Sequence, residues 1–357
     1  MNVLDYMERY GHEQLSVYTD KDAGLRALIA IHDTTLGPAL GGVRVWPHAT
    51  EDEAVMDALR LSRAMTYKSA AAGLDLGGGK GLIIADSRTD KTKALMRAFG
   101  RFVDTLGGRY ITTEDVGTSL DDLEWIAEET AHVRGLPLSR GGSGETSEMT
   151  GWGVYRGLKA CAKEVWGNDS LSGKRIAFQG FGHTATFLTK HLLKREEGVR
   201  LIVTDLNEEA TSRAREWAGA EIVSPNDIYD AECDIFSPSA LGGVLNGETI
   251  PRLKCRIVCG SANNQLLSEE DAGALRKRGI LYAPDYIVNA GGVINISYEA
   301  DGGYNEQAAT EKTGRIYETM EQVIAISKQQ GITTAAAADR LAEERIERAR
   351  KDRTTTR

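Results

Sequence analysis

The feature that most constrains the fold is a glycine turn that follows an apolar strand and opens a helix, in "RIAFQGFGHTATFL" (175–188). The turn matches the pattern G-x-G-x-x-G/A and consists of Gly180, Phe181, Gly182, His183, Thr184 and Ala185. In this pattern the first glycine permits a tight turn, the second lets a pyrophosphate touch the backbone, and the small last residue lets the helix pack on the strand. The phosphates then lie at a helix N-terminus, where the amide dipoles favour anions. The turn therefore predicts a dinucleotide-binding domain of the Rossmann type.

An acidic residue after the next strand indicates which dinucleotide is bound. Asp205 ends "VRLIVTD", about the usual distance of 20 residues beyond the turn. A carboxylate there accepts hydrogen bonds from a ribose 2′-hydroxyl and repels a 2′-phosphate. Leu206 and Asn207 supply no cation that would reverse this preference. The expected cofactor is NAD rather than NADP.

The pattern of elements predicts a two-domain α/β protein. In the second half, "CDIFSPSAL", "CRIVCGSANN" and "GILYAPDYIVNAGG" extend the series of strands, which indicates a doubly wound parallel sheet with helices on both faces. In the first half we expect strands at 25–33, 42–47, 80–86 and 109–115, and a helix that begins with a capping box at Thr50 and ends near Met65. The breaker-rich stretch 135–148 is interpreted as a hinge.

Composition excludes several classes of function. The 357 residues carry a net charge of −9 without a basic stripe, so nucleic acid is not an expected partner. The chain has no signal peptide and no apolar run long enough to span a bilayer, so we expect a cytoplasmic protein with no membrane partner. The four cysteines lack the spacing of a metal site and are interpreted as reduced core residues, so no metal is expected.

Three glycines run directly into a lysine in "GLDLGGGKGLII" (73–84). This is not a phosphate-binding P-loop, because Leu74 stands where the first glycine is required and Gly81 follows Lys80 in place of serine or threonine. The glycines are expected to let a substrate lie close to the backbone. Lys68 and Lys80 flank this segment of small residues, which predicts that both amines are held in position and not free in solvent.

Long motifs along the chain resemble the leucine/phenylalanine/valine dehydrogenase family, relatives of glutamate dehydrogenase, and its leucine dehydrogenase branch most of all. They are "IAIHDTTLGPALGGVR", "DALRLSRAMTYK", "AGLDLGGGKGLII", "GRYITTEDVG", "CGSANNQL" and "YAPDYIVNAGGVIN". The resemblance covers residues 1 to about 350. It implies a mixed-sheet domain for substrate binding and oligomerisation at 1–148, rejoined by a C-terminal helix at about 335–357. An NAD-binding domain would occupy 149–334, with a cleft separating the two.

The resemblance also implies a reaction, in which NAD oxidises an L-amino acid and the product is hydrolysed to a 2-oxo acid and ammonia. Lys80 would be the general base that activates water, and Asp115 would exchange protons with the amino group. A lysine can do this only if burial or a neighbouring cation depresses its pKa. The substrate would be held by Lys68, Asn263, Gly41, Gly42 and Met65. The cofactor would be lined by Thr150, Ser239, Ala240, Ala262, Asn263 and Asn289. A homo-oligomer, either a dimer or an octamer, is implied as well.

The implied side-chain pocket favours an apolar substrate. It consists of Leu40, Thr113, Val293 and Ile296. Burying a second carboxylate against Leu40 and Ile296 would be costly, so glutamate is disfavoured and a branched-chain amino acid is favoured. Thr113 and Ile296 replace the family's usual alanine and valine, and Arg134 replaces a small residue. These departures leave open an aromatic substrate such as phenylalanine or tryptophan, or a polar one paired with Arg134.

An alternative of another class is a catalytically silent NAD-binding protein. Lys68, Lys80, Asp115 and Asn263 argue against it, because a sensor needs none of the four.

Overall fold

The computed structural model describes residues 2–300 and 303–355, which divide into two compact units. Unit 1 consists of Met1–Glu145, Ile296–Glu306 and Ala342–Arg357, and unit 2 of Thr146–Asn295 and Gln307–Leu341. The sequence analysis placed residues 296–306 in the second domain. The contacts of this segment assign it to unit 1 instead.

Unit 1 is built on a mixed five-stranded sheet, as expected. The strands are β1 (Gln14–Asp20), β2 (Leu25–Asp33), β3 (Ala39–Trp46), β4 (Gly77–Ile84) and β5 (Tyr110–Glu114). Their order is β1-β2-β4-β3-β5, with β1 and β4 antiparallel to β2, and with β4 and β5 parallel to β3. The helices of the same part of the chain are α1 (Val3–Tyr10), α2 (Glu51–Ala71), α3 (Lys93–Asp104), α4 (Leu120–Ala127) and the 3-10 turn η1 (Leu138–Arg140).

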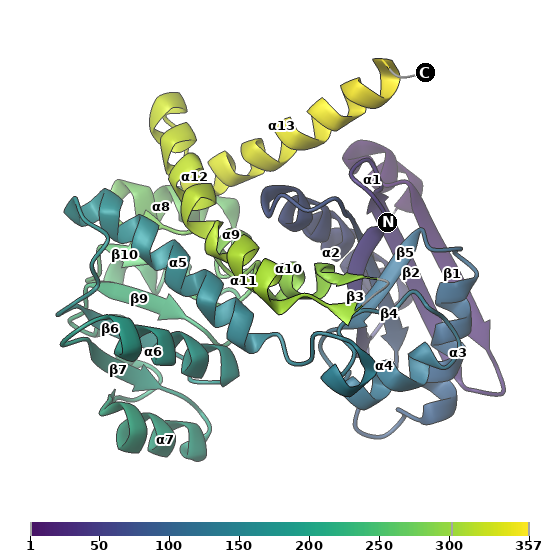
Figure 1. The fold of residues 1–357 in the computed structure, drawn as a ribbon, viewed down its shortest axis with the longest axis horizontal. Helices are drawn as coiled ribbons and strands as arrows, with labels where there is room; N and C mark the ends of the chain where they lie inside the picture. Colours follow the sequence, from purple (N-terminus) through teal and green to yellow (C-terminus); the bar gives the residue numbers. More distant parts are fainter. Residues whose placement is uncertain (1, 301–302, 356–357) are drawn as a thin grey trace. The chain divides into compact units, whose positions relative to one another are not determined.

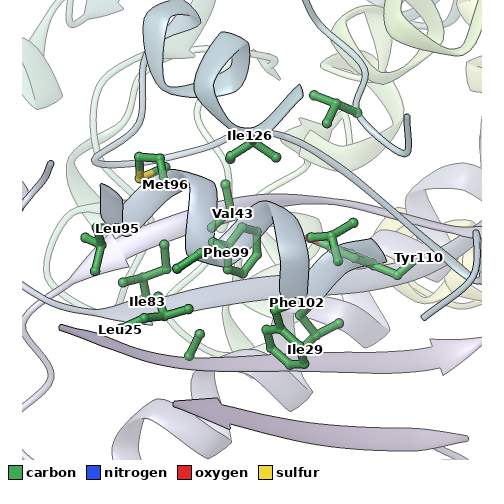
Figure 2. Packing of buried hydrophobic residues seen from close by; sticks show 14 of the residues in the cluster. Leu25, Ile29, Val43, Ile83, Leu95, Met96, Phe99, Phe102, Tyr110 and Ile126 are labelled. Carbon is green, nitrogen blue, oxygen red and sulfur yellow. The ribbon is translucent and has the colours of Figure 1, made fainter. Parts of the chain in front are cut away.

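Alternating residues of the strands bury both faces of this sheet. On one face Ile29, Val43 and Ile83 pack under Phe99 and Phe102 of α3, as Figure 2 shows. On the other face, Leu28 and Leu82 pack against Ala58 and Leu59 of α2 in a second cluster. Successive residues of a strand point to opposite faces, so one strand supplies both clusters. The central strand β4 is thereby held rigidly between two helices.

Helix α2 begins as predicted but ends later. The Thr50 side chain accepts a hydrogen bond from the Glu53 amide at 3.2 Å and caps the first turn. We expected the helix to end near Met65 and Lys68 to follow it, which is wrong. Small residues carry the helix on to Ala71, and the chain leaves it only where Gly73 takes a left-handed conformation at φ +68°. Lys68 therefore lies in the last turn of α2.

The three glycines of "GGGK" are the start of β4 and not a loop before it. A side chain on Gly78 would collide with the backbone amide of Thr66 in α2, and one on Gly79 would lie 2.7 Å from the ring of Tyr110. We expected these glycines to admit a substrate. Within unit 1 they instead admit a helix and an aromatic ring, because only a residue without Cβ allows so close an approach.

Unit 2 contains the predicted parallel sheet. Its strands are β6 (Arg175–Gln179), β7 (Arg200–Thr204), β8 (Glu221–Ile222), β9 (Ile235–Pro238), β10 (Ile257–Val258) and β11 (Leu281–Tyr282). Their order is β11-β10-β9-β6-β7-β8, and every pair is parallel. The order reverses at β6, which creates the topological switch point where doubly wound sheets bind ligands.

Helices cover both faces of this sheet, and Figure 1 shows α5 in front of it and α8 behind it. The helical elements of unit 2 are α5 (Ser147–Trp166), α6 (His183–Arg195), α7 (Glu208–Ala218), η2 (Asp227–Asp230), η3 (Ile250–Arg252), α8 (Glu269–Lys277), α9 (Asp285–Val288), α11 (Glu306–Gly314) and α12 (Ile316–Gln330). The chain changes units along α10 (Gly291–Ser297) and α13 (Thr334–Thr355), and the short strands β12 (Glu299–Ala300) and β13 (Gly303–Tyr304) form a hairpin. No helix among the described residues has the length and apolar character needed to cross a membrane.

Candidate active site

The two expected catalytic residues of unit 1 form an ion pair. Lys80 lies in β4 with its side chain only 6% exposed, and Asp115 follows β5 directly. The Lys80 Nζ donates to Asp115 Oδ2 at 2.7 Å. Both strands flank β3 and run parallel to it, so the sheet itself fixes the approach of the two side chains.

The electrostatics of this pair fit a base that titrates below the usual range of lysine. Burial lowers the pKa of Lys80, and the opposite charge of Asp115 works against this shift without cancelling it. Burial raises the pKa of Asp115, but Lys80 and Arg44 outweigh it and hold the pKa below its ordinary value. Arg44 also lowers the pKa of Lys80.

Arg44 is a residue that the sequence analysis missed. The sequence analysis required burial or a neighbouring cation to depress the pKa of Lys80, and Arg44 is such a cation. The arginine was already visible as the last residue of "ALGGVR", but nothing in the sequence placed it near Asp115.

Lys68 belongs to α2, which covers one face of the five-stranded sheet of unit 1. The contact of Gly78 with Thr66 brings the end of α2 against the strand that carries Lys80. Met65 and Lys68 are both half-buried in the last two turns. Arg345 of α13 donates to the carbonyls of Ala70 and Leu74, at 3.1 and 2.7 Å, and so secures the end of the helix.

Two expected pocket residues meet around Gly135. A side chain there would begin 2.8 Å from Thr113 Oγ1 and 3.7 Å from Ile296 Cγ2. Gly135 has φ +82°, so its conformation also disfavours other residues. Leu40 of β3 is fully buried, and Gly41 and Gly42 face backbone atoms of β4 and β5.

Arg134 is half-buried, and its guanidinium Nη1 donates to the carbonyl of Val133 at 3.1 Å. The backbone amide of Arg134 donates to the carbonyl of Thr112 at 2.9 Å. The guanidinium is thus already bonded to the main chain of its own segment. A role in recognising a polar substrate has no support from these contacts.

Glu299 is a further residue that sequence reasoning missed. Its buried carboxylate accepts from the amide of Gly135 at 2.9 and 3.0 Å and from that of Ser143 at 2.7 Å. These bonds tie the segment after Ile296 to the loop 135–143. They explain why residues 296–306 belong to unit 1. No sequence pattern marked Glu299, because its partners are backbone amides more than 150 residues away.

The glycine turn of unit 2 has the form that a dinucleotide requires. Gly180 has φ +99°, and a Cβ there would lie 2.6 Å from that of Ala240. Gly182, by contrast, faces open space, and it caps a 13-residue helix without a side-chain hydrogen bond. A helix N-terminus without a side-chain cap, beside open space at Gly182, suits an anion. His183 and Thr184 begin the helix, Phe181 is buried, and Ala185 packs against the sheet.

Asp205 lies beside this turn, as expected. Its Oδ2 accepts from the Phe181 amide at 2.6 Å and its Oδ1 from the Asn207 amide at 2.9 Å. A carboxylate has further lone pairs, so a ribose hydroxyl can still bind. Arg213 of α7 donates to the Phe181 carbonyl at 3.1 Å. The sequence analysis considered only the two residues after Asp205 and missed this cation.

The remaining expected residues of unit 2 gather at the carboxyl ends of the strands. Ser239 donates its amide to Gln179 at the end of β6, and Ala262 donates to Pro238 at the end of β9. Asn289 Nδ2 donates to the Ser261 carbonyl at 3.2 Å and to Asn263 Oδ1 at 2.8 Å. Because a carbonyl only accepts, this Asn289 group must be the amide nitrogen, and the Asn263 atom facing it must be oxygen.

Thr150, another residue expected at the cofactor, packs within unit 2 against Gly291 and Gly292, which precede Val293. A Cβ on Gly292 would lie 3.0 Å from Thr150 Oγ1, which donates to the Thr146 carbonyl at 2.9 Å. Val293, the next residue, is buried. Thr150 thus lies against the start of α10.

The cysteines have no reactive partner. Cys161, Cys233, Cys255 and Cys259 are free and buried, and burial raises their pKa values. The described residues hold no group of three or more His, Cys, Asp or Glu side chains able to bind a metal.

Comparison with family models decides which proteins share this arrangement. Residues 12–132 match the model described as "Glu/Leu/Phe/Val dehydrogenase, dimerisation domain", and residues 141–354 match "Glutamate/Leucine/Phenylalanine/Valine dehydrogenase". The chain belongs to the Glu/Leu/Phe/Val dehydrogenase family. The resemblance inferred from the motifs is confirmed, and the protein is an amino acid dehydrogenase.

Individual relatives of this dehydrogenase family are similar over nearly the whole chain. Leucine dehydrogenase of Thermoactinomyces intermedius is 56% identical, over 99% of this chain and 96% of its own. Leucine dehydrogenase of Geobacillus stearothermophilus is 55% identical, over 99% and 95%. The crystal structure of L-tryptophan dehydrogenase from Nostoc punctiforme has a TM-score of 0.85 at 43% identity, and covers 98% of this chain and 99% of that one.

Proposed function

We propose that the protein catalyses the reversible, NAD-dependent oxidative deamination of a hydrophobic L-amino acid, with leucine, valine and isoleucine preferred. The buried ion pair of Lys80 and Asp115 carries this proposal. A lysine of lowered pKa next to an ionised carboxylate supplies both the base and the proton acceptor that the reaction needs. Two leucine dehydrogenases among the relatives support the same substrate class.

Each residue has a separate task in this proposal. The ammonium of Lys68 binds the substrate carboxylate, together with the amide nitrogen of Asn263. Asp115 takes a proton from the substrate ammonium, so that the amine can lose hydride from its carbon. NAD, when bound, supplies the acceptor for that hydride. Lys80 then removes a proton from the water that adds to the imine carbon, and Asp115 returns a proton to the departing ammonia.

The described residues around the expected pocket support an apolar substrate. Leu40 and Ile296 are buried, and Thr113 offers only a hydroxyl. A charged substrate side chain buried against Leu40 and Ile296 would find no opposite charge on these residues, which is costly. A methylene contributes about 0.8 kcal/mol when buried, so selection among similar apolar amino acids is expected to be soft.

The fit of NAD rests on the glycine turn and Asp205. Open space at Gly182 and the uncapped start of α6 suit a pyrophosphate, and Asp205 suits a ribose hydroxyl. We also propose a homo-oligomer, because the model that matches residues 12–132 describes a dimerisation domain.

An assay of NADH formation tests the proposal directly. The purified protein is incubated with NAD and a panel of leucine, valine, isoleucine, phenylalanine, tryptophan and glutamate, one at a time. We expect the highest kcat/KM with a branched-chain amino acid and no measurable turnover of glutamate. A preference for phenylalanine or tryptophan would transfer the proposal to the aromatic class. Absence of turnover with the whole panel would overturn it.

A further inference from the structure

Arg44 links two carboxylates of unit 1 that lie on different elements. From β3, its Nε donates to Asp115 Oδ2 at 3.0 Å and its Nη1 donates to Asp57 Oδ2 at 2.9 Å. Asp57 belongs to α2, on the face that packs against the sheet, and its side chain is 13% exposed. Two hydrogen bonds in different directions fix a guanidinium far better than one, since its donors form a rigid fork.

Arg44 and Lys80 donate to the same oxygen of Asp115. The distances to Oδ2 are 3.0 Å from Arg44 Nε and 2.7 Å from Lys80 Nζ. Within residues 2–300 and 303–355, no hydrogen-bond donor reaches Asp115 Oδ1. The second oxygen thus remains available to a substrate ammonium.

The shared oxygen matters when Lys80 gives up its proton. Asp115 then loses one of its two cations while its own surroundings stay poor in water, with its side chain 23% exposed. Burial alone favours the neutral carboxyl, which cannot accept a proton from the substrate. Arginine does not lose its proton in proteins, so Arg44 stays charged throughout the cycle.

We propose that Arg44, anchored by Asp57, is a positioning residue that holds Asp115 in line with Lys80 and keeps a permanent positive charge beside both groups. This inference rests on the proposed function, because it assigns Lys80 and Asp115 to proton transfer. Arg44 acts through its hydrogen bond to Asp115, and the proposal assigns it no contact with the substrate.

Other charged groups surround the pair, and the test must separate Arg44 from them. Asp57 has two further neighbours. Arg60 Nη2 donates to Asp57 Oδ1 at 3.2 Å, and His48 Nε2 lies 3.3 Å from Asp57 Oδ2. Glu114, the residue before Asp115, is itself acted on by the charges of Glu145, Asp122 and Lys91. All of them remain in place when only Arg44 is changed.

The test is the pH dependence of kcat/KM for oxidative deamination in Arg44→Met. Loss of this cation raises the pKa of Lys80, since Arg44 lowers it in the wild type. The rising limb of the profile is therefore expected to move to higher pH by about one unit, which is about a tenfold loss at a fixed pH on that limb. Arg26→Met is the matched control. It removes the same charge from an exposed pair with Glu51 and should leave the limb in place.

Arg44→Lys separates charge from a merely structural role. It keeps the cation, so its limb should lie closer to wild type than that of Arg44→Met, provided that thermal unfolding shows both variants to be folded. An unmoved limb in Arg44→Met, an equal shift in Arg26→Met, or an Arg44→Lys limb as displaced as that of Arg44→Met would overturn the proposal.

A second measurement needs no turnover. Trace acetylation of Lys80 by acetic anhydride, followed across pH by peptide mass spectrometry, reports the titration of this amine. We expect its midpoint to rise in Arg44→Met and to stay in place in Arg26→Met, and equal midpoints in wild type and Arg44→Met would overturn the proposal. If the wild type turned over none of the amino acids, the proposed function would fail while this titration still decided the effect of Arg44.

Discussion

At Lys80, burial and a neighbouring carboxylate act on the same amine in opposite directions. Burial disfavours the charged ammonium, and Asp115 favours it. The net shift is downward, in the direction that favours a lysine as a base. The Lys80 Nζ lies 2.7 Å from Asp115 Oδ2, so the two groups titrate in direct contact.

Replacing Lys80 with Ala should abolish nearly all turnover without affecting cofactor binding. General base catalysis contributes on the order of 10²–10⁴-fold, and kcat should fall within that range or further. NADH binding, measured by fluorescence, should be unchanged. Lys93→Ala, which removes an exposed lysine from the same unit, is the control. Wild-type turnover in Lys80→Ala would remove this residue from the mechanism.

His32 gives unit 1 a specific sensitivity to acid. Its Nε2 donates to the Tyr10 carbonyl at 2.9 Å, so the neutral ring must accept at Nδ1 from the Thr66 hydroxyl, 2.8 Å away. Burial lowers the pKa of His32 from 6.5 to about 4. A proton on Nδ1 would reverse the bond to Thr66, whose hydroxyl would then accept, on the helix that carries Lys68.

The sign of this effect follows from the protons bound by each state. Between pH 6.5 and about 4 the unfolded chain holds the proton and the folded protein does not, so the free energy of unfolding falls as the pH falls. The full loss corresponds to about 3 kcal/mol. Thermal unfolding of His32→Gln should show a shallower decline than wild type over this window. Parallel curves would contradict the prediction.

At the scale of elements, one asparagine joins the loop after β10 to the segment that follows β11 and α9. Asn289 orients the Asn263 amide so that its oxygen points to Asn289 and its nitrogen is directed elsewhere. This is the orientation in which Asn263 can donate to a carboxylate. Asn289 was expected to line the cofactor, which stays a prediction; its bonds to Ser261 and Asn263 also predict that it positions the Asn263 amide.

Exchanging Asn289 for Asp tests this orientation. The new carboxylate only accepts, so it would repel the Asn263 oxygen and draw its nitrogen inward. We expect KM for the amino acid to rise by about tenfold, since a lost hydrogen bond to a charged group costs about 1.5 kcal/mol. Affinity for NADH, measured separately, should change much less. A loss of NADH affinity with an unchanged amino-acid KM would favour the cofactor role instead.

The glycine turn and Asp205 carry the proposed preference for NAD. Asp205→Ser removes the charge that repels a 2′-phosphate, and Arg213 already lies on the Phe181 carbonyl nearby. We therefore expect this variant to raise kcat/KM with NADP relative to NAD. Adding Arg213→Met should reverse part of that gain. Equal use of NAD and NADP by the wild type would contradict the preference for NAD.

At the scale of the whole molecule, the end of the chain returns to complete the first unit. Arg345 bonds the carbonyls at the end of α2 and pairs with Asp75 at 2.9 Å. Tyr67 donates to Glu343 at 3.1 Å, and Arg350 bonds Asp33. Residues about 270 positions apart thus share one folded unit.

Arg345→Met should lower the melting temperature and raise KM for the amino acid. Removing this side chain takes the described donor from the Leu74 carbonyl and a second donor from the Ala70 carbonyl, which still accepts from Gly73; an unsatisfied buried acceptor costs about 1–3 kcal/mol. The disturbed turn contains Lys68, so substrate binding should weaken while NADH binding is retained. Arg348→Met, on the same helix, is the control. Unchanged stability and KM would show that the last helix is dispensable for the site.

Local patterns were sufficient for much of the fold. Alternating and continuous apolar runs predicted β2, β6 and β7, and Thr50 predicted the start of α2. These signals act over a few residues, through side-chain alternation and capping. The end of α2 and the start of β4 were misplaced, because Thr66 and Gly78 pack against each other across a bend in the chain. Helix and strand propensities depend on nearby residues in the sequence, so they cannot predict such a contact.

The sequence by itself determined the family, the reaction class and the chemical types available, because long motifs place lysine, aspartate and glycine at defined spacings. Only the tertiary structure decided which partners those residues contact. It brought Arg44 to Asp115, Glu299 to Gly135 and Asn289 to Asn263. Charge and hydrogen bonding act through distances of a few ångströms in space, and folding sets these distances independently of separation along the chain.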